Sequence, residues 1–141
     1  MSNTESEKHD DLPQLALLLE QGGSISIGKD RRKNPHYYEQ VRIAAKPEAL
    51  APLKLRFGGS ISTNGHRGGV VWRATANVAR KFFMAVKPFV VKRLVEVDAV
   101  ITFGKIRQES AETGGSGGMA KVAGSTRAIL EIERRRRSES N

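Results

Sequence analysis

Seven polar side chains are expected on one face of four segments that alternate in the manner of β-strands. The segments are 24–27, 37–45, 59–63 and 70–75, and each carries apolar residues on its opposite face. Hydroxyl, amide and guanidinium groups hydrogen-bond to base edges and phosphates, and the set contains no carboxylate. The pattern therefore favours a nucleic-acid surface over an ordinary solvated sheet face. The seven residues are Ser24, Ser26, Gln40, Arg42, Ser60, Ser62 and Arg73.

Two loops between these segments add basic side chains. GKDRRKNPH at 28–36 and NGHRGG at 64–69 each join two neighbouring strand candidates, so each is expected at the tip of a hairpin. Exposed bases at such tips can hold phosphate, although a solvated turn would have a similar composition. The candidate contacts are Lys29, Arg31, Arg32, Lys33, His66 and Arg67.

The net charge points to the same kind of partner. The 141 residues carry a formal charge of +9. Residues 1–11 contain one basic and four acidic residues. Residues 12–120 contain 17 basic and eight acidic residues, and residues 121–141 contain six basic and three acidic residues. The positive excess thus lies mainly in the central part of the chain, which favours a polyanion as partner without proving specific binding.

Other bulk properties exclude several classes of protein. There is no cysteine, which excludes disulfides and thiolate metal sites and fits a reducing compartment. The longest apolar run, 15–19, is far shorter than the roughly 20 residues that span a bilayer, so no membrane partner is expected. The start, MSNTESEKHDD, is no secretory signal. We expect a cytoplasmic, DNA-associated protein.

Helical patterns flank the four strand candidates. Asp11 can cap a first helix, in which Pro13 is tolerated because it lies in the first turn. In segment 70–75, Trp72 is expected to face the core and Val71 to face outward. Helices are expected from 12 to the glycines at 22–23, at 47–57, at 77–86, at 91–106 and, in a shorter form, around 127–133. This order predicts an α+β fold in which helices cover one face of a four-stranded antiparallel sheet.

The chain divides into four parts by composition. The expected parts are a disordered acidic tail at 1–10, a folded domain at 11–112, a Gly/Ser linker at 113–118, and a short helix with a basic tail at 119–141. Within the domain, EQGGSISI at 20–27 and RFGGSIST at 56–63 are similar. They predict two similar helix-to-strand corners.

Several phrases, taken in order, resemble the LAGLIDADG homing endonucleases over about residues 12–105. They are LALLLEQGGSISI, PEALAPLKLRFGGSIS, VVWRATANVARKFF and KPFVVKR. The resemblance implies an αββαββα domain with a saddle-shaped sheet that sits in the DNA major groove. A single copy of the family nonamer, here at 15–23, implies a homodimer. It also implies an ancestry in an intron or intein.

The resemblance also locates the positions of the family's active site. In active members an acid in the nonamer binds Mg²⁺, and that position is Gly22 here. The family's polar residue before the second helix corresponds to Ala44, and its basic residue to Lys92 or Arg93. Leu17 replaces a glycine that lets the central helices approach, which puts the dimer packing in doubt. Glu20 is a fallback acid, though two residues along a helix point it away from Gly22.

These observations lead to a DNA-binding protein with the family fold and a lost nuclease site. No cofactor is predicted, and Mg²⁺ would be needed only if cleavage survives. Whether the chain is an enzyme stays open, with loss of cleavage favoured. The alternatives are an active Mg²⁺-dependent endonuclease with a non-standard acid and an RNA-binding, maturase-like splicing cofactor.

Overall fold

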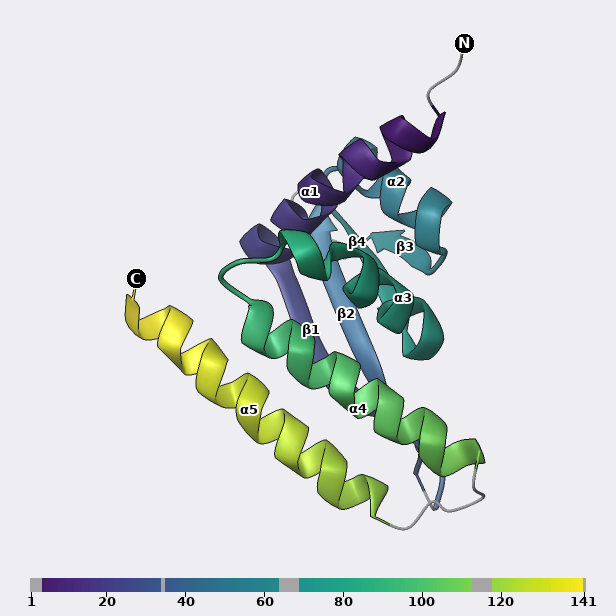
Figure 1. The fold of residues 1–141 in the computed structure, drawn as a ribbon, viewed down its shortest axis with the longest axis vertical. Coiled ribbons are helices and arrows are strands. Elements are labelled where there is room, and N and C mark those ends of the chain that lie inside the picture. Colours follow the sequence, from purple (N-terminus) through teal and green to yellow (C-terminus); the bar gives the residue numbers. More distant parts are fainter. Residues whose placement is uncertain (1–3, 34, 64–68, 113–117, 141) are drawn as a thin grey trace.

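The structure is a computed structural model that describes residues 4–33, 35–63, 69–112 and 118–140 (Figure 1). Helices and strands alternate in the order αββαββα, followed by two further long helices. Their bounds are α1 (Thr4–Gly22), β1 (Gly23–Lys29), β2 (Tyr37–Ala45), α2 (Pro47–Phe57), β3 (Ser60–Thr63), β4 (Val70–Thr75), α3 (Ala76–Val86), a 3₁₀ turn (Lys87–Phe89), α4 (Leu94–Glu112) and α5 (Met119–Ser140).

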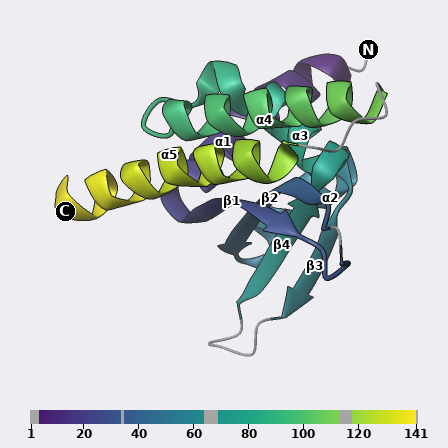
Figure 2. The ribbon, with the colours of Figure 1, turned by 90° about the horizontal axis from the view of Figure 1, so that it is seen from below.

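The four strands form one antiparallel sheet in the order β1-β2-β4-β3. Figure 2 shows α1, α3 and α4 on one side of the sheet, while the opposite face of β4 and β3 is uncovered. Helix α5 runs beside β1 and against α4. The predicted α+β class and sheet are therefore confirmed.

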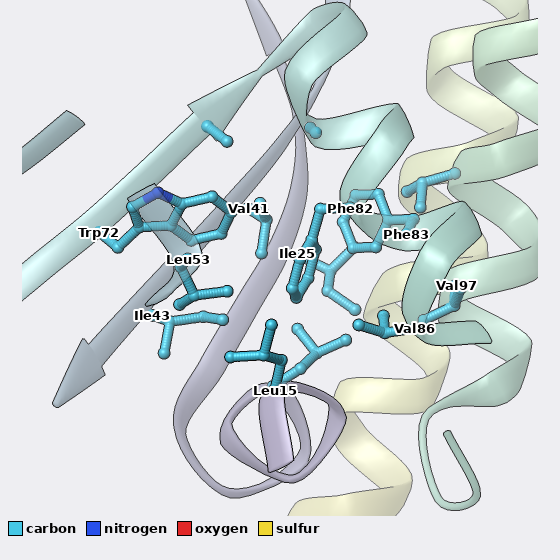
Figure 3. Packing of buried hydrophobic residues seen from close by; sticks show 14 of the residues in the cluster. Leu15, Ile25, Val41, Ile43, Leu53, Trp72, Phe82, Phe83, Val86 and Val97 are labelled. Atoms are coloured by element: carbon cyan, nitrogen blue, oxygen red, sulfur yellow. The ribbon is translucent and has the colours of Figure 1, made fainter. Parts of the chain in front are cut away.

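The core lies between the sheet and its covering helices (Figure 3). Helix α3 buries the residues that recur at helical spacing, Ala79, Phe82, Phe83 and Val86. The ring of Phe82 meets that of Trp72 edge-on at a centroid distance of 5.2 Å. The indole Nε1 of Trp72 donates to the carbonyl of Gly58 at 2.8 Å, so this large side chain is buried without an unsatisfied donor.

The sequence predicts some boundaries well and others badly. Segments 37–45, 47–57 and 70–75 are confirmed to the residue. Helix α1, however, begins at Thr4 rather than after Asp11, so most of the expected disordered tail is helical and Pro13 lies inside the helix. Strand β1 extends through Lys29, which was expected in the loop.

The C-terminal helices also differ from expectation. Helix α4 starts at Leu94 rather than 91, because a 3₁₀ turn and an extended Val90 precede it, and it continues to Glu112. Residues 119–140 form one long helix, α5, where a short helix and a tail were expected. Glu131 pairs with Arg134 and Arg135 at helical spacing, which stabilises the basic end as helix. Of the linker expected at 113–118, residues 113–117 lie outside the described part of the chain.

Val71 was expected to be exposed but retains only 7% of its accessible surface, although it is not part of the core cluster. Alternation along β4 still places it on the face opposite Trp72. Within the described residues, no helix is long and apolar enough to cross a membrane.

Candidate nucleic-acid interface

The strand register places four of the predicted residues in one row across the sheet. Ser24 pairs with Arg42, Arg42 with Arg73, and Arg73 with Ser60. All four are exposed. Because neighbouring strands are about 4.8 Å apart, the row is roughly 14 Å long. Sequence alone could not reveal this row, since it depends on which strands pair and in which register.

Two arginines stand directly opposite each other in the middle of this row. Arg42 and Arg73 are cross-strand partners, and among the described residues neither pairs with a carboxylate. Like charges placed opposite each other in a sheet destabilise it. The arrangement is therefore unfavourable in the free protein and becomes favourable when an anion lies over it.

The remaining polar residues of the sheet lie in the adjacent rows. Ser26 pairs with Gln40, and Gln40 pairs with Thr75 on β4. Both Ser26 and Gln40 are half-buried. Ser62 is exposed and pairs with the covered Val71. The seven predicted residues therefore share one open face.

The basic loop after β1 is organised by one acid. The Asp30 carboxylate accepts hydrogen bonds from the amides of Arg32 and His36, at 3.2 and 3.1 Å, and pairs with the Arg32 guanidinium at 3.3 Å. Lys29, Arg31 and Lys33 are exposed around it. This loop lies at the end of the sheet away from Gly23. His66 and Arg67 lie outside the described residues.

Glu20 holds the segment that leads into α4. Its Oε1 accepts hydrogen bonds from the backbone amides of Val91 and, at 2.8 Å, Lys92. The oxygen is thus engaged with two donors rather than presented to a metal. This contact gives Glu20 a structural role, so its carboxylate is poorly suited to act as the fallback metal-binding acid.

The two candidate basic residues have different surroundings. Arg93 is only 4% exposed, and its Nε and Nη2 donate to Glu96 at 2.9 Å each. Its Nη1 donates to the carbonyls of Leu19, at 3.0 Å, and Gly23. Arg93 therefore satisfies carbonyls at the junction of α1 and β1, which leaves little of its guanidinium exposed for the predicted contact with DNA. Lys92 is exposed and remains available.

The corner between α1 and β1 lacks the groups that would hold a metal. Gly22 is exposed, and a Cβ placed on it would lie 3.5 Å from the carbonyl oxygen of Ala44. The two positions that the resemblance assigns to the family's active site are thus neighbours, but neither residue has a side-chain atom that could bind a metal. Within the described residues, no group of three or more His, Cys, Asp or Glu could bind a metal. The Mg²⁺ site of the family does not fit these residues.

The run at 134–137 suggests either a phosphate clamp or a solubilising end, and sequence reasoning missed the basic groove that α5 forms beside β1. Arg127, Arg134 and Arg137 line a groove beside β1, and Arg127 donates to the Ile27 carbonyl at 2.9 Å. The hydrogen bond from Arg134 holds the pKa of Glu131 below its ordinary value. The spacing of seven and three residues puts the three arginines on one helical face. This spacing could have been recognised in the sequence, but only if the helix expected around 127–133 had been extended to include Arg137.

No protein-family model matches this chain, and a search of curated proteins finds no match. Solved structures, in contrast, match over most of its length. The homing endonuclease I-CvuI in complex with the I-CreI target is similar with a TM-score of 0.70 and 11% identity, covering 92% of this chain and 93% of that one. The archaeal intron-encoded homing endonuclease I-Vdi141I, complexed with DNA, has a TM-score of 0.60 and 14% identity, covering 92% of this chain and 98% of that one.

A third neighbour differs in length. The LAGLIDADG homing endonuclease I-SmaMI, bound to cleaved DNA, is similar with a TM-score of 0.64 and 14% identity, covering 85% of this chain but 42% of that one. Identities this low establish the fold, not the activity. The chain has the fold of the LAGLIDADG homing endonucleases, as its sequence phrases implied.

Proposed function

We propose that this protein binds duplex DNA in the major groove through the open face of its sheet and does not cleave it. The observation that carries the proposal is the Arg42–Arg73 pair. Two opposed cations without a described carboxylate partner favour a polyanion over that face. The neighbouring homing endonucleases I-CvuI and I-Vdi141I are in complexes with DNA, which supports the same partner here.

The dimensions and chemistry of the face agree with this role. The major groove is about 12 Å wide and admits a two-stranded β-ribbon, so the two central strands, β2 and β4, can enter it. Arginine is suited to guanine and to phosphate, and glutamine is suited to adenine. We therefore assign base reading to Gln40, contact with guanine or phosphate to Arg42 and Arg73, and phosphate contact to Lys29, Arg31 and Lys33.

The residues at the corner between α1 and β1 support the proposed loss of cleavage. Gly22 and Ala44 offer no side-chain donors, and Glu20 already accepts two backbone amides. Carboxylate oxygens are what Mg²⁺ requires from a protein. Without them the DNA is held but no metal-bound water is positioned.

A second copy of the chain is part of the proposal. Leu17 on α1 is 51% exposed, and Val91, in the segment that Glu20 holds against α1, is 77% exposed. Leu17 lies three residues before Glu20, so it shares that helical face. Burying these side chains in a homodimer would remove apolar surface from water. We propose that two copies meet along this face.

The test is fluorescence anisotropy with random-sequence duplex DNA over a range of salt concentrations. The unaltered protein should bind with an affinity that falls steeply with salt. The double variant Arg42→Gln/Arg73→Gln should lower the slope of log K against log salt by about 2, because two phosphate-neutralising charges are lost. The matched control is Lys81→Gln/Lys105→Gln, which removes the same charge from exposed residues of α3 and α4.

The outcomes separate the alternatives. An equal effect of both double variants, or no binding to duplex DNA, contradicts the proposal. Stronger binding to structured RNA than to duplex DNA would favour the maturase-like alternative. Nicking of plasmid DNA by the unaltered protein with Mg²⁺ would show that an endonuclease activity survives.

A further inference from the structure

A basic groove runs along the outer edge of the sheet, between β1 and α5. It has a volume of about 490 Å³. The β1 wall is Gly23 to Ile27, and the facing wall is the C-terminal half of α5. Four arginines and two glutamates line it, leaving two positive charges in excess. They are Arg93, Arg127, Arg134, Arg137, Glu96 and Glu131.

Helix α5 is fixed along this edge at two points. Near its middle, Arg127 donates to the Ile27 carbonyl at 2.9 and 3.3 Å, and its guanidinium lies 5.6 Å from the centre of the Tyr37 ring. Near its end, Arg137 pairs with the buried Glu96, which also holds Arg93. The helix therefore runs antiparallel to β1, from Ile27 towards the Gly23 corner.

This placement brings the arginine end of α5 to the open face. Ser24 and Ser26, which belong to the cross-strand rows of that face, also line the groove. Arg134 is 67% exposed and points from α5 into the same space. Hydroxyl and guanidinium groups are what proteins use to hold DNA phosphates. The groove thus continues the proposed DNA surface beyond the edge strand.

Only part of the arginine run takes part. Arg134 and Arg137 line the groove, whereas Arg135 and Arg136 do not. At 100° per residue, Arg134 and Arg137 are 60° apart on the helix, while Arg136 faces roughly the opposite way. The run is therefore not a uniform basic patch, and its members can be distinguished by experiment.

We propose that the groove between β1 and α5 binds a backbone phosphate of duplex DNA, held by Arg134, Arg137 and the hydroxyl of Ser24. The inference rests on the proposed function and adds a helix to a DNA surface otherwise made of strands and loops. A phosphate there also relieves the excess of two positive charges in the groove.

The experiment compares two single variants of the full chain. Arg134→Gln and Arg136→Gln remove one charge each from α5, from side chains that are 67% and 71% exposed and paired with a glutamate three residues earlier. Arg134→Gln should reduce the salt slope of duplex binding by about 1 and weaken binding roughly tenfold at fixed salt. Arg136→Gln should leave both close to those of the unaltered protein. Arg134→Gln/Arg137→Gln should reduce the slope by up to about 2.

Several results would overturn the inference. If Arg134→Gln and Arg136→Gln weaken duplex binding equally, α5 contributes to DNA affinity only through its overall positive charge. If Arg42→Gln/Arg73→Gln weakens binding and Arg134→Gln does not, the sheet binds DNA without the groove, and the proposed function stands alone. If inorganic phosphate shifts the Arg134 side-chain NMR signal but duplex DNA does not, the site serves a small phosphate instead. Because Arg134 is exposed, its variant is expected to fold.

Discussion

The two Gly-Gly corners have similar sequences but different structures. At EQGGSISI, α1 continues through Gly22 and β1 begins at Gly23, and neither glycine has a positive φ. At RFGGSIST, α2 ends at Phe57, and Gly58 and Gly59 have φ values of 95° and 83° before β3 begins. The first corner requires glycine because a side chain would clash there, and the second requires glycine because the backbone has positive φ values. A repeated phrase therefore predicts the order of elements without predicting why its glycines are there.

Gly59→Ala should be the most damaging substitution at either corner. A Cβ at Gly59 would lie 2.7 Å from the Arg73 carbonyl oxygen and 2.8 Å from Trp72 Nε1, at a φ that disfavours any side chain. We expect a loss of about 3 to 4 kcal/mol in the free energy of unfolding, from overpacking and backbone strain together. Urea unfolding followed by the fluorescence of Trp72, the single tryptophan, measures it.

The control for the glycine variants at both corners is Gly124→Ala in α5. A Cβ there meets nothing within 4 Å, and alanine favours helix, so stability should rise by about 0.5 to 1 kcal/mol. A Gly59→Ala protein as stable as the unaltered one would show that the second corner can rearrange freely.

Gly23→Ala should be the next most damaging. A Cβ there would lie 2.6 Å from Leu19 Cδ1 and 2.7 Å from the Leu19 carbonyl oxygen, which also accepts a hydrogen bond from Arg93. The expected loss is about 2 to 3 kcal/mol, smaller than for Gly59→Ala because φ is ordinary. Thermal unfolding by circular dichroism measures it, and an unchanged midpoint would contradict the claim that this corner is sterically constrained.

Gly58→Ala should have an intermediate effect from backbone conformation alone. Its φ is 95° and ψ is −142°, yet a Cβ would meet nothing within 4 Å. We expect a loss of about 1 to 2 kcal/mol in urea unfolding. If Gly58→Ala proves as damaging as Gly59→Ala, then backbone strain rather than contact with Trp72 dominates this corner.

Gly22→Ala should have the smallest effect. The nearest atom to its Cβ, the Ala44 carbonyl oxygen, is at ordinary contact distance, so the unfolding free energy should change by less than about 0.5 kcal/mol. Gly22→Asp/Ala44→Gln then supplies the side chains that the resemblance implies for an active site. Mg²⁺-dependent nicking of plasmid DNA by this double variant, but not by the unaltered protein, would support the proposed loss of the metal ligand.

Sequence reasoning predicted the features that depend on residues close together in the chain. Alternation placed Ser24, Arg42 and Arg73 on one face, and the glycines and prolines placed the ends of most elements. The burial of Arg93 was not predictable, because its acceptors, Leu19 and Gly23, are some seventy positions away in the chain. The same holds for the Arg42–Arg73 pairing, which depends on strand register.

The long helix α5 shows a different limit. Four consecutive arginines look equivalent in sequence, and only the helix divides them between a groove and solvent. Arg134 and Arg136 have similar exposure and similar acidic partners, so neither propensity nor charge separates them. Packing of α5 against β1 makes the distinction, and packing of distant segments is what local pattern reasoning lacks.

Helix α5 also bears on how the protein avoids aggregation. An edge strand with unpaired carbonyls can recruit a strand from another molecule. Here the carbonyls of Gly23 and Ile27 on edge strand β1 accept hydrogen bonds from Arg93 and Arg127. The opposite edge, β3, is only four residues long. Addition of a strand from another molecule is thereby hindered at both edges of the sheet.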